Sequence, residues 1–376
     1  MAKEYAQPRN ALEFRARAPC RSHKAFRSPF SPDPAGCEND SVSPFTWRDI
    51  ASVFSRDVLR IDAAAESGRI ENAIRQQVLV ALKRRGAIIG LSGGIDSCVV
   101  AVLCVRALGR ERVLGLLMPE RDSSDDALRL GRMMAEQLGV RYQVEDIAPA
   151  LAGFGCYERQ REAIRKVVPE YGEGWRCKLT IPPLLDGDRL NITSLTVADP
   201  EGNQRTARMP PAAYLQLVAA TNFKQRCRKM AEYYHADRLI YAVAGTPNLL
   251  EYDQGFFVKQ GDGAADFKPI AHLYKTQVYA LAEHFEVPDE IRARAPTTDT
   301  FSLAQPQEEF YFALPYAQMD LCLWAHNHGT PPEEVGAVLG LSAAQVQRVY
   351  RDIEAKRRAG RYRHLAPLLV DAGQGA

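Results

Sequence analysis

The sequence lacks long apolar runs, paired cysteines and a marked net charge, and each absence excludes a class of protein. No apolar run approaches the roughly 18 residues that a membrane helix needs, and the formal net charge is only +2. We therefore expect no membrane span and no nucleic-acid partner. None of the eight cysteines forms a CxxC pair. The cysteines therefore give no indication of a zinc site or a disulfide framework. The N-terminus has no apolar signal-peptide core, so we expect a cytoplasmic protein.

The chain divides by composition into three parts. Residues 1–45 are rich in Arg, Ser and Pro and show little periodicity, which predicts a flexible extension. Residues 46–330 are predicted to form one domain. Residues 331–376 contain two amphipathic segments, 331–340 and 342–360, so we expect a C-terminal helical segment and a tail.

Short apolar segments alternate with amphipathic ones through much of the chain. Strands are predicted at 87–92, 112–120, 141–147 and 238–246, and helices up to Gly86 and over 96–109, 124–139, 214–236 and 273–287. This alternation predicts an α/β fold with a doubly wound parallel sheet. The rhythm breaks at about 152–211, where "SLTVAD", "PEGN" and "QRTARM" are typical of a hairpin. We expect a β-rich insertion there, acting as a flap or an interface element.

The stretch "IIGLSGGIDS" places glycines, hydroxyls and a carboxylate directly after a predicted buried strand. Glycines let backbone N–H groups approach an anion closely, and the following helix N-terminus favours negative charge. The loop is neither a Walker A nor a GxGxxG motif. It resembles the SGGxDS pyrophosphate loop of the N-type ATP pyrophosphatases, which adenylate a carboxylate or carbonyl and release pyrophosphate. In that reading, Asp96 holds Mg²⁺ against the phosphates, because hard cations prefer carboxylate oxygen.

Two further segments narrow the resemblance. "AGTPNLLEYDQGFFVKQGDGAADFKPIAHLYKTQV" and the preceding "NFKQRCRKM" are similar, in the same order, to motifs of the NAD synthetase family. The resemblance covers about residues 58–357 and implies a Rossmann-like fold of the adenine nucleotide alpha hydrolase type. It also implies a ligase that adenylates deamido-NAD with ATP and Mg²⁺ and then aminates it with ammonia, and it implies a homodimer.

The resemblance assigns roles residue by residue. Asp96 and Lys275 match the catalytic positions, and Asp96 and Glu251 match the two magnesium carboxylates. The ATP-binding positions are Gly90, Ser92, Gly93, Gly94, Asp96, Ser97, Thr246, Lys275 and Thr297, and the deamido-NAD positions are Arg226, Lys259, Asp266 and Lys356.

The residues alone leave structural roles open for some of these positions. Lys275 also suits a solvated helix face, Arg226 and Arg228 suit a charged helix face, and Asp266 suits the cap of a helix or turn. The residues before the loop hold no candidate amidase, so the resemblance implies free ammonia or ammonia from a separate glutaminase.

Three departures from the family pattern concern the acceptor side. They are the insertion, the replacement of a C-terminal His-Lys pair by Ala355-Lys356, and the sequence "PQE" at 306–308 where the family has "TDE". They keep a second hypothesis open, an amide ligase that acts on another carboxylate in sugar or natural-product biosynthesis. A tRNA-modifying or sulfur-transferring enzyme would need a basic surface or paired reactive cysteines, and neither is visible.

Overall fold

The computed structural model describes residues 54–181, 184–186, 193–297 and 300–370, all within the compact unit Ser52–Ala376. The predicted extension at 1–45 and the end of the tail at 371–376 lie outside the described residues. The strands are β1 Ala87–Gly90, β2 Val113–Leu117, β3 Arg141–Val144, β4 Arg176–Thr180, β5 Ser194–Ala198, β6 Gln204–Arg208 and β7 Ala242–Val243.

The helices of the first half are α1 Ala63–Arg75, α2 Ile95–Leu108, α3 Asp125–Leu138, α4 Ala148–Gly153, α5 Cys156–Arg165 and α6 Pro211–Leu239. The second half contains α7 Leu249–Gln254, α8 Lys275–His284, α9 Asp289–Ala293, α10 Tyr316–Asn327, α11 Pro332–Leu339 and α12 Ala343–His364. Short 3₁₀ or π turns are η1 Arg56–Leu59, η2 Gln76–Ala81, η3 Arg110–Arg112, η4 Leu184–Asp186 and η5 Glu308–Phe312.

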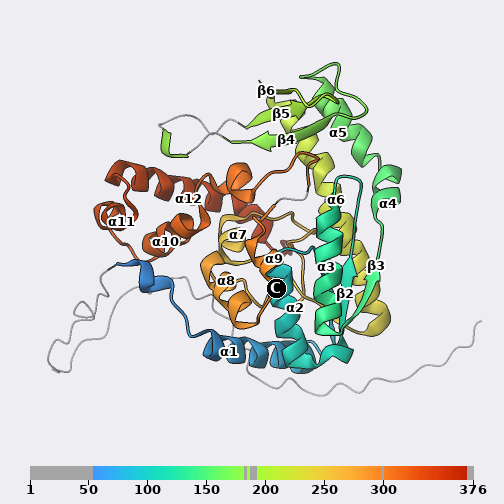
Figure 1. The fold of residues 1–376 in the computed structure, drawn as a ribbon, viewed down its shortest axis with the longest axis vertical. Coiled ribbons are helices and arrows are strands. Elements are labelled where there is room, and N and C mark those ends of the chain that lie inside the picture. The colour runs from blue at the N-terminus through green and yellow to red at the C-terminus, as the bar shows by residue number, and fades with distance from the viewer. Residues whose placement is uncertain (1–53, 182–183, 187–192, 298–299, 371–376) are drawn as a thin grey trace, which may run out of the picture. The chain divides into compact units, whose positions relative to one another are not determined.

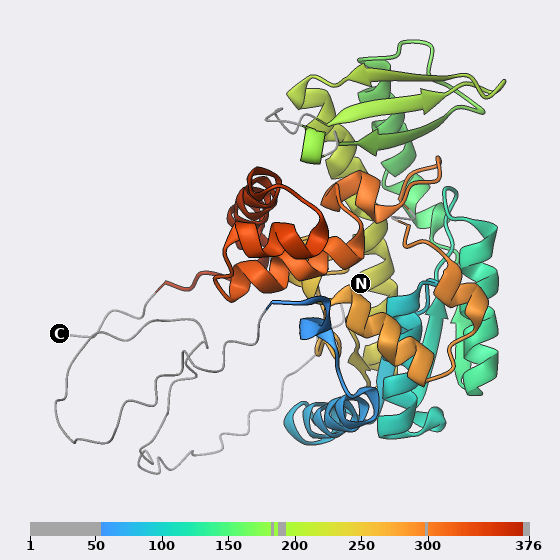
Figure 2. The ribbon, with the colours of Figure 1, turned by 60° about the vertical axis from the view of Figure 1, so that its left-hand side comes forward.

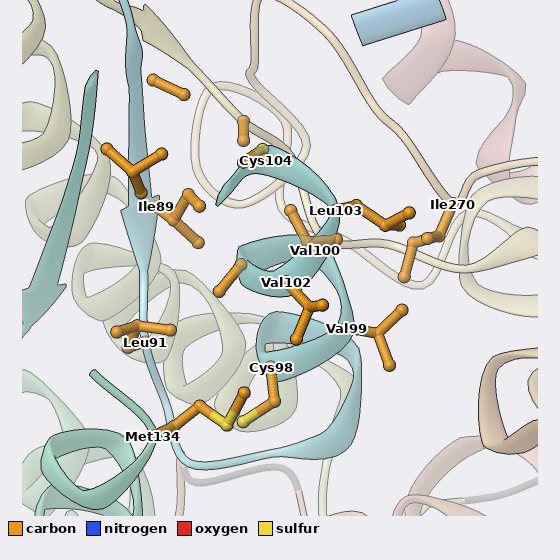
Figure 3. Close-up of a cluster of buried hydrophobic side chains, with 14 of the residues drawn as sticks. Ile89, Leu91, Cys98, Val99, Val100, Val102, Leu103, Cys104, Met134 and Ile270 are labelled. Carbon is orange, nitrogen blue, oxygen red and sulfur yellow. The ribbon is translucent and has the colours of Figure 1, made fainter. Parts of the chain in front are cut away.

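The predicted doubly wound parallel sheet is confirmed. Its strands lie in the order β3-β2-β1-β7, and all three pairings are parallel. Successive side chains of a strand point to opposite faces. Ile89 therefore packs with α1, α2, α3 and α8 in the main core, whereas Ile88 packs against α6 on the other face. Figure 3 shows the main core, with Ile89 and Leu91 beside the apolar side chains of α2.

The segment at 152–211 contains the predicted hairpin but begins with helices that its sequence did not predict. Strands β4, β5 and β6 form a separate antiparallel sheet in that order. Figure 2 shows this sheet as a layer beyond the end of the parallel sheet. Before it, α5 packs along α6. The buried side of α5 consists of Cys156, Gln160 and Ala163, which are small or polar, and Ile164, so the segment has few of the large apolar residues from which a helix is predicted.

Two other boundaries differ from the sequence prediction. The predicted strand at 238–246 is reduced to Ala242–Val243, because α6 runs on to Leu239 and ends at Ile240 with a φ of 57°. The helix predicted up to Gly86 ends earlier, as α1 followed by η2.

The C-terminal helices have a core of their own. Side chains of α10, α11 and α12 pack in one cluster with Leu250 of α7 and Leu184 of η4. The Arg348 side chain on α12 donates a hydrogen bond to the Leu185 carbonyl, 3.1 Å away. The described part of the connection between β4 and β5, η4, therefore contacts the C-terminal helices.

Candidate functional site

The loop between β1 and α2 forms one end of a large cavity. Gly93 has a φ of 70°, and a Cβ atom there would lie 2.7 Å from the Ala127 carbonyl oxygen, so this turn requires glycine. The Ser97 hydroxyl donates to the Gly94 carbonyl at 2.9 Å and lies 3.2 Å from the Ser92 hydroxyl. These bonds hold the loop against the N-terminus of α2, where backbone N–H groups and the helix dipole favour an anion.

The cavity has a volume of about 710 Å³, within the range of small-molecule sites. It lies at the carboxyl ends of β1 and β2, where doubly wound sheets bind ligands. Residues predicted to bind ATP, substrate or magnesium that line it are Gly90, Ser92, Gly94, Asp96, Ser97, Thr246, Glu251, Thr297 and Lys356.

Two carboxylates of the cavity come from distant parts of the chain. Asp96 lies in the first turn of α2 and Glu251 in the first turn of α7. Asn248 caps α7 through a capping box with Glu251, and its amide donates to Asp96 Oδ1 at 3.2 Å. Burial, together with the nearby charge of Asp96, raises the pKa of Glu251 to about 8. A cation between the two groups would relieve this repulsion, so the pair fits Mg²⁺, which binds one or two carboxylates plus substrate phosphates.

Lys275 is fully buried at the first residue of α8 and forms an ion pair with Asp96. Burial alone would lower the pKa of Lys275, but the charges of Asp96 and Glu251 outweigh it and raise that pKa. The solvated-face interpretation of Lys275 is therefore wrong. Lys275 itself does not line the cavity and is linked to it through Asp96, which does. Asp320 accepts hydrogen bonds from the backbone N–H groups of residues 275 and 276.

Three residues predicted to bind the substrate lie outside the cavity lining. Arg226 donates to the Lys259 carbonyl at 3.3 Å, and Lys259 Nζ donates to the carbonyls of Tyr362 and Leu365. Asp266 accepts hydrogen bonds from the Val243 N–H at 2.8 Å and the Tyr233 hydroxyl at 3.2 Å. Within one chain these residues do not meet the phosphate loop, and their predicted role in binding stays a prediction.

The cavity contains charged residues that the sequence reasoning did not assign. Arg228, Lys229 and Glu232 of α6 line it, and Lys229 donates to Glu232 at 2.6 Å although both side chains are only 8% exposed. Burial raises the pKa of Glu232 despite Lys229. Their i, i+3 spacing resembles a solvated helix face. The length of α6 argues against a fully solvated face for these charges, because a long helix with charges on all sides must still bury one of them.

The remaining prediction on this cavity concerns Lys356, the lysine of the C-terminal His-Lys pair whose histidine is replaced by Ala355 in this chain. Lys356 Nζ lies 2.6 Å from Asp352 on the same helix. Burial lowers the pKa of Lys356 although Asp352 opposes the shift. Its ammonium group also lies 4.8 Å from the centre of the Tyr311 ring. This places one cation of α12 in the same cavity as the phosphate loop.

Comparison with known proteins agrees with this geometry. The family model described as NAD synthase matches residues 67–170 and 190–360. The NH(3)-dependent NAD(+) synthetase of Mesorhizobium japonicum is 66% identical over 318 residues, which is 84% of this chain and 100% of the relative. The protein of the same name from Thermotoga maritima is 37% identical over 242 residues, 64% of this chain and 79% of the relative.

Solved structures share the fold. The NMN synthetase of Francisella tularensis has a TM-score of 0.56 at 21% identity, over 83% of this chain and 100% of that one. The NH3-dependent NAD synthetase of Campylobacter jejuni has a TM-score of 0.54 at 20% identity, with the same coverage of 83% and 100%. Since the family model covers most of the chain and the relatives match it at high identity, the chain belongs to the NAD synthase family.

Proposed function

We propose that this chain is an ammonia-dependent NAD⁺ synthetase that adenylates the carboxylate of deamido-NAD and replaces AMP with ammonia. The observation that carries the proposal is the cluster of Asp96, Glu251 and Lys275 beside the phosphate loop. The chain that contains this cluster matches the synthetase of Mesorhizobium japonicum over the whole length of that relative. The 66% identity to an NH(3)-dependent NAD(+) synthetase also argues against the second hypothesis, an amide ligase that acts on another carboxylate.

Different residues at the cavity bind the phosphates, hold the nucleotide and stabilise the developing charge. The loop at 90–97 and the N-terminus of α2 bind the phosphates of ATP. The acceptor carboxylate attacks the α-phosphate to give an acyl-adenylate and pyrophosphate. Ammonia then attacks the acyl carbon, and AMP leaves. Lys275 places its buried positive charge near the developing pyrophosphate, while Thr246 and Thr297 hold the nucleotide, so catalysis rests on positioning and charge stabilisation.

Asp96 and Glu251 would hold Mg²⁺ in this site. Bound there, the ion would supply electrostatic neutralisation of the pyrophosphate. One oxygen of Glu251 already accepts a hydrogen bond from the Asn248 N–H at 3.1 Å. The capping box therefore fixes the orientation of this carboxylate before any ligand arrives.

We also propose a homodimer formed through α6. Leu215, Met230 and Tyr234 are 61–65% exposed, and at about 100° per residue they lie with Arg226 within an arc of about 100°. Exposed apolar groups of this size on one helix side mark interaction surfaces. A partner there would cover Arg226, consistent with its predicted acceptor role. Sedimentation equilibrium should give twice the chain mass, and a monomer at micromolar concentration would contradict the proposal.

We place the enzyme in the cytoplasm, the compartment that supplies ATP. The cysteines at positions 98, 104, 156, 177, 227 and 322 are buried free thiols, as expected in a reducing compartment. Among the described helices, none combines the length and the apolarity that crossing a bilayer requires.

The activity is tested by incubating the purified protein with ATP, Mg²⁺, ammonium and nicotinic acid adenine dinucleotide. We expect NAD, AMP and pyrophosphate in equal amounts. Glutamine in place of ammonium should give no product without an added glutaminase. ATP binding without NAD formation would contradict the proposed acceptor while leaving the nucleotide site intact.

Arg226→Ala should raise the KM for nicotinic acid adenine dinucleotide by about tenfold, the loss expected for one charge-assisted contact, and change the KM for ATP by less than about twofold. Initial rates with one substrate varied at a time measure both values. Arg110→Ala is the control, since this side chain is 66% exposed and forms an ion pair with its neighbour Glu111. Equal effects on both substrates would make Arg226 an ordinary surface arginine.

A further inference from the structure

The segment from Thr300 to Gln307 lies between the antiparallel insertion and the nucleotide cavity. Thr300, Phe301 and Gln307 line the cavity, together with Thr297 just before them. Of these described residues, 300–305 belong to no helix or strand. The end of the segment is closed by the bridge between Thr297 and Pro306 and by the Gln307 N–H, which donates to the Pro296 carbonyl at 2.9 Å. Residues 300–305 have no helical or sheet hydrogen bonds of their own, so their backbone must be fixed from outside.

The insertion supplies that support through the edge of β4. Strand β4 is the outer strand of its sheet, so its other edge is available for pairing. The Leu303 N–H donates to the Cys177 carbonyl at 3.0 Å, and the Cys177 N–H donates to the Ser302 hydroxyl at 3.0 Å. The Gln305 side-chain amide donates to the Leu179 carbonyl. Cys177 and Leu179 are two residues apart, so their outward groups follow the period of a strand.

Apolar packing joins the same two parts. Phe301 is 7% exposed and belongs to the hydrophobic cluster of the insertion, which includes Leu179, Leu195 and Val197. The Phe301 ring also lies 5.8 Å from the ring of Phe310 in η5. Since Phe301 lines the nucleotide cavity as well, the core of the insertion continues into the cavity wall.

A buried lysine holds the opposite end of the segment. Lys224 of α6 is fully buried, and its ammonium donates to the Thr300 carbonyl at 2.9 Å. The same ammonium pairs with Glu120 at 2.9 Å and Asp122 at 2.7 Å. Both acids follow β2, next to the cavity residues Pro119 and Ser123. Lys224 therefore ties the segment to the end of the parallel sheet.

We propose that the antiparallel insertion is a positioning element for ATP: the edge of β4 holds residues 300–307 against the nucleotide cavity, with Ser302 and Gln305 as its positioning residues. The inference rests on the proposed function, because it concerns the same nucleotide site. It assigns the insertion a role in the shape of the site, in place of the flap or interface element that the sequence suggested. The described wall includes two further residues of the insertion, Ile181 and Thr193.

The test is the double variant Ser302→Ala/Gln305→Leu, measured by calorimetric titration with an ATP analogue that is not hydrolysed. Removing two supporting hydrogen bonds should weaken binding by about tenfold and raise the KM for ATP similarly, with kcat changed by less than about twofold. Gln305 is 2% exposed, so leucine keeps the buried volume. The single variant Ser302→Thr keeps a hydroxyl acceptor and the Gln305 side chain, so it should bind the analogue like the wild type.

Thr196→Val is the matched control. It removes the side-chain contact between Thr196 and Thr206, 2.9 Å long, within the same sheet but between β5 and β6. We expect unchanged ATP affinity. Equal weakening by the control and the double variant, or no weakening by either, would overturn the proposal. Because nucleotide binding needs no acceptor, a failed NAD assay would leave this result interpretable.

Hydrogen exchange on the wild type adds a measurement that needs no variant. The Leu303 amide should exchange at least about tenfold more slowly than an exposed amide, because its donor is paired with β4 in the resting protein. Exchange at the exposed rate would overturn the proposal even if the double variant failed to fold.

Discussion

Asp96→Asn should lower the rate of pyrophosphate release by about 10³-fold or more. The change removes one of the two carboxylates that would hold Mg²⁺, and it also removes the charged partner of the fully buried Lys275. Losing a preorganised electrostatic contact typically costs a factor of 10²–10³, and the lost metal ligand adds to this. Steady-state release of pyrophosphate measures the effect.

The fold should survive this change, because Glu251 still lies near Lys275 and the capping box of α7 is intact. Circular dichroism should therefore match the wild type. Asp126→Asn is the control, since it makes the same chemical change at an exposed residue of α3 paired with Arg129. Near-normal turnover of Asp96→Asn would contradict the assignment of the metal site.

Lys224→Met should lower the free energy of unfolding by about 3–5 kcal/mol, the usual cost of breaking a buried ion pair by removing one partner. Lys224 and Glu120 are both fully buried, and Asp122 is 9% exposed. Methionine fills the space of the lysine stem but leaves Glu120 without its cation and Asp122 with Arg121 as its remaining one. Urea unfolding followed by fluorescence measures the loss.

A compensated variant tests this explanation. Adding Glu120→Gln and Asp122→Asn to Lys224→Met removes the uncompensated charges, so most of the lost stability should return. If the triple variant is as unstable as the single one, packing rather than charge explains the cost.

The Asp122 carboxyl gives the same network a pH dependence. Burial alone would raise the pKa of Asp122, but Arg121 and Lys224 outweigh it and lower that pKa from 3.8. A carboxyl whose pKa is lower in the folded state stabilises the fold at pH values above its unfolded-state pKa. This contribution is lost as the pH falls through the folded-state pKa. The stability gained from Asp122 should therefore be complete at neutral pH and disappear below about pH 3.8.

Local patterns in the sequence were sufficient to predict the parallel sheet and the glycine-containing turn after its strand β1. Strands β1 and β2 are short apolar runs, and "SGGIDS" follows the first of them. These signals lie within a few neighbouring residues. The hairpin of β5 and β6 was equally local, since Asp199 and Gly202 mark its turn.

Features that depend on distant partners could not be predicted in this way. Lys275 and Asp96 are 179 positions apart, and only the fold decides whether that lysine is solvated or buried. Helix α6 has charges around its circumference, so its sequence does not reveal that Arg228 faces the cavity while Arg226 does not. In α5, Gln160 takes an inward position that an apolar residue would have made recognisable.

The occupied edge of β4 also bears on solubility. An unpaired strand edge is a template for another chain and a common origin of aggregation. Residues 302–305 cover that edge, which leaves β6 as the other outer strand of the described sheet. Strand β6 reads Gln-Arg-Thr-Ala-Arg and is mostly exposed, and charged side chains oppose edge-to-edge association. Moving the insertion to another protein without residues 300–307 would uncover β4 and make the graft prone to aggregate.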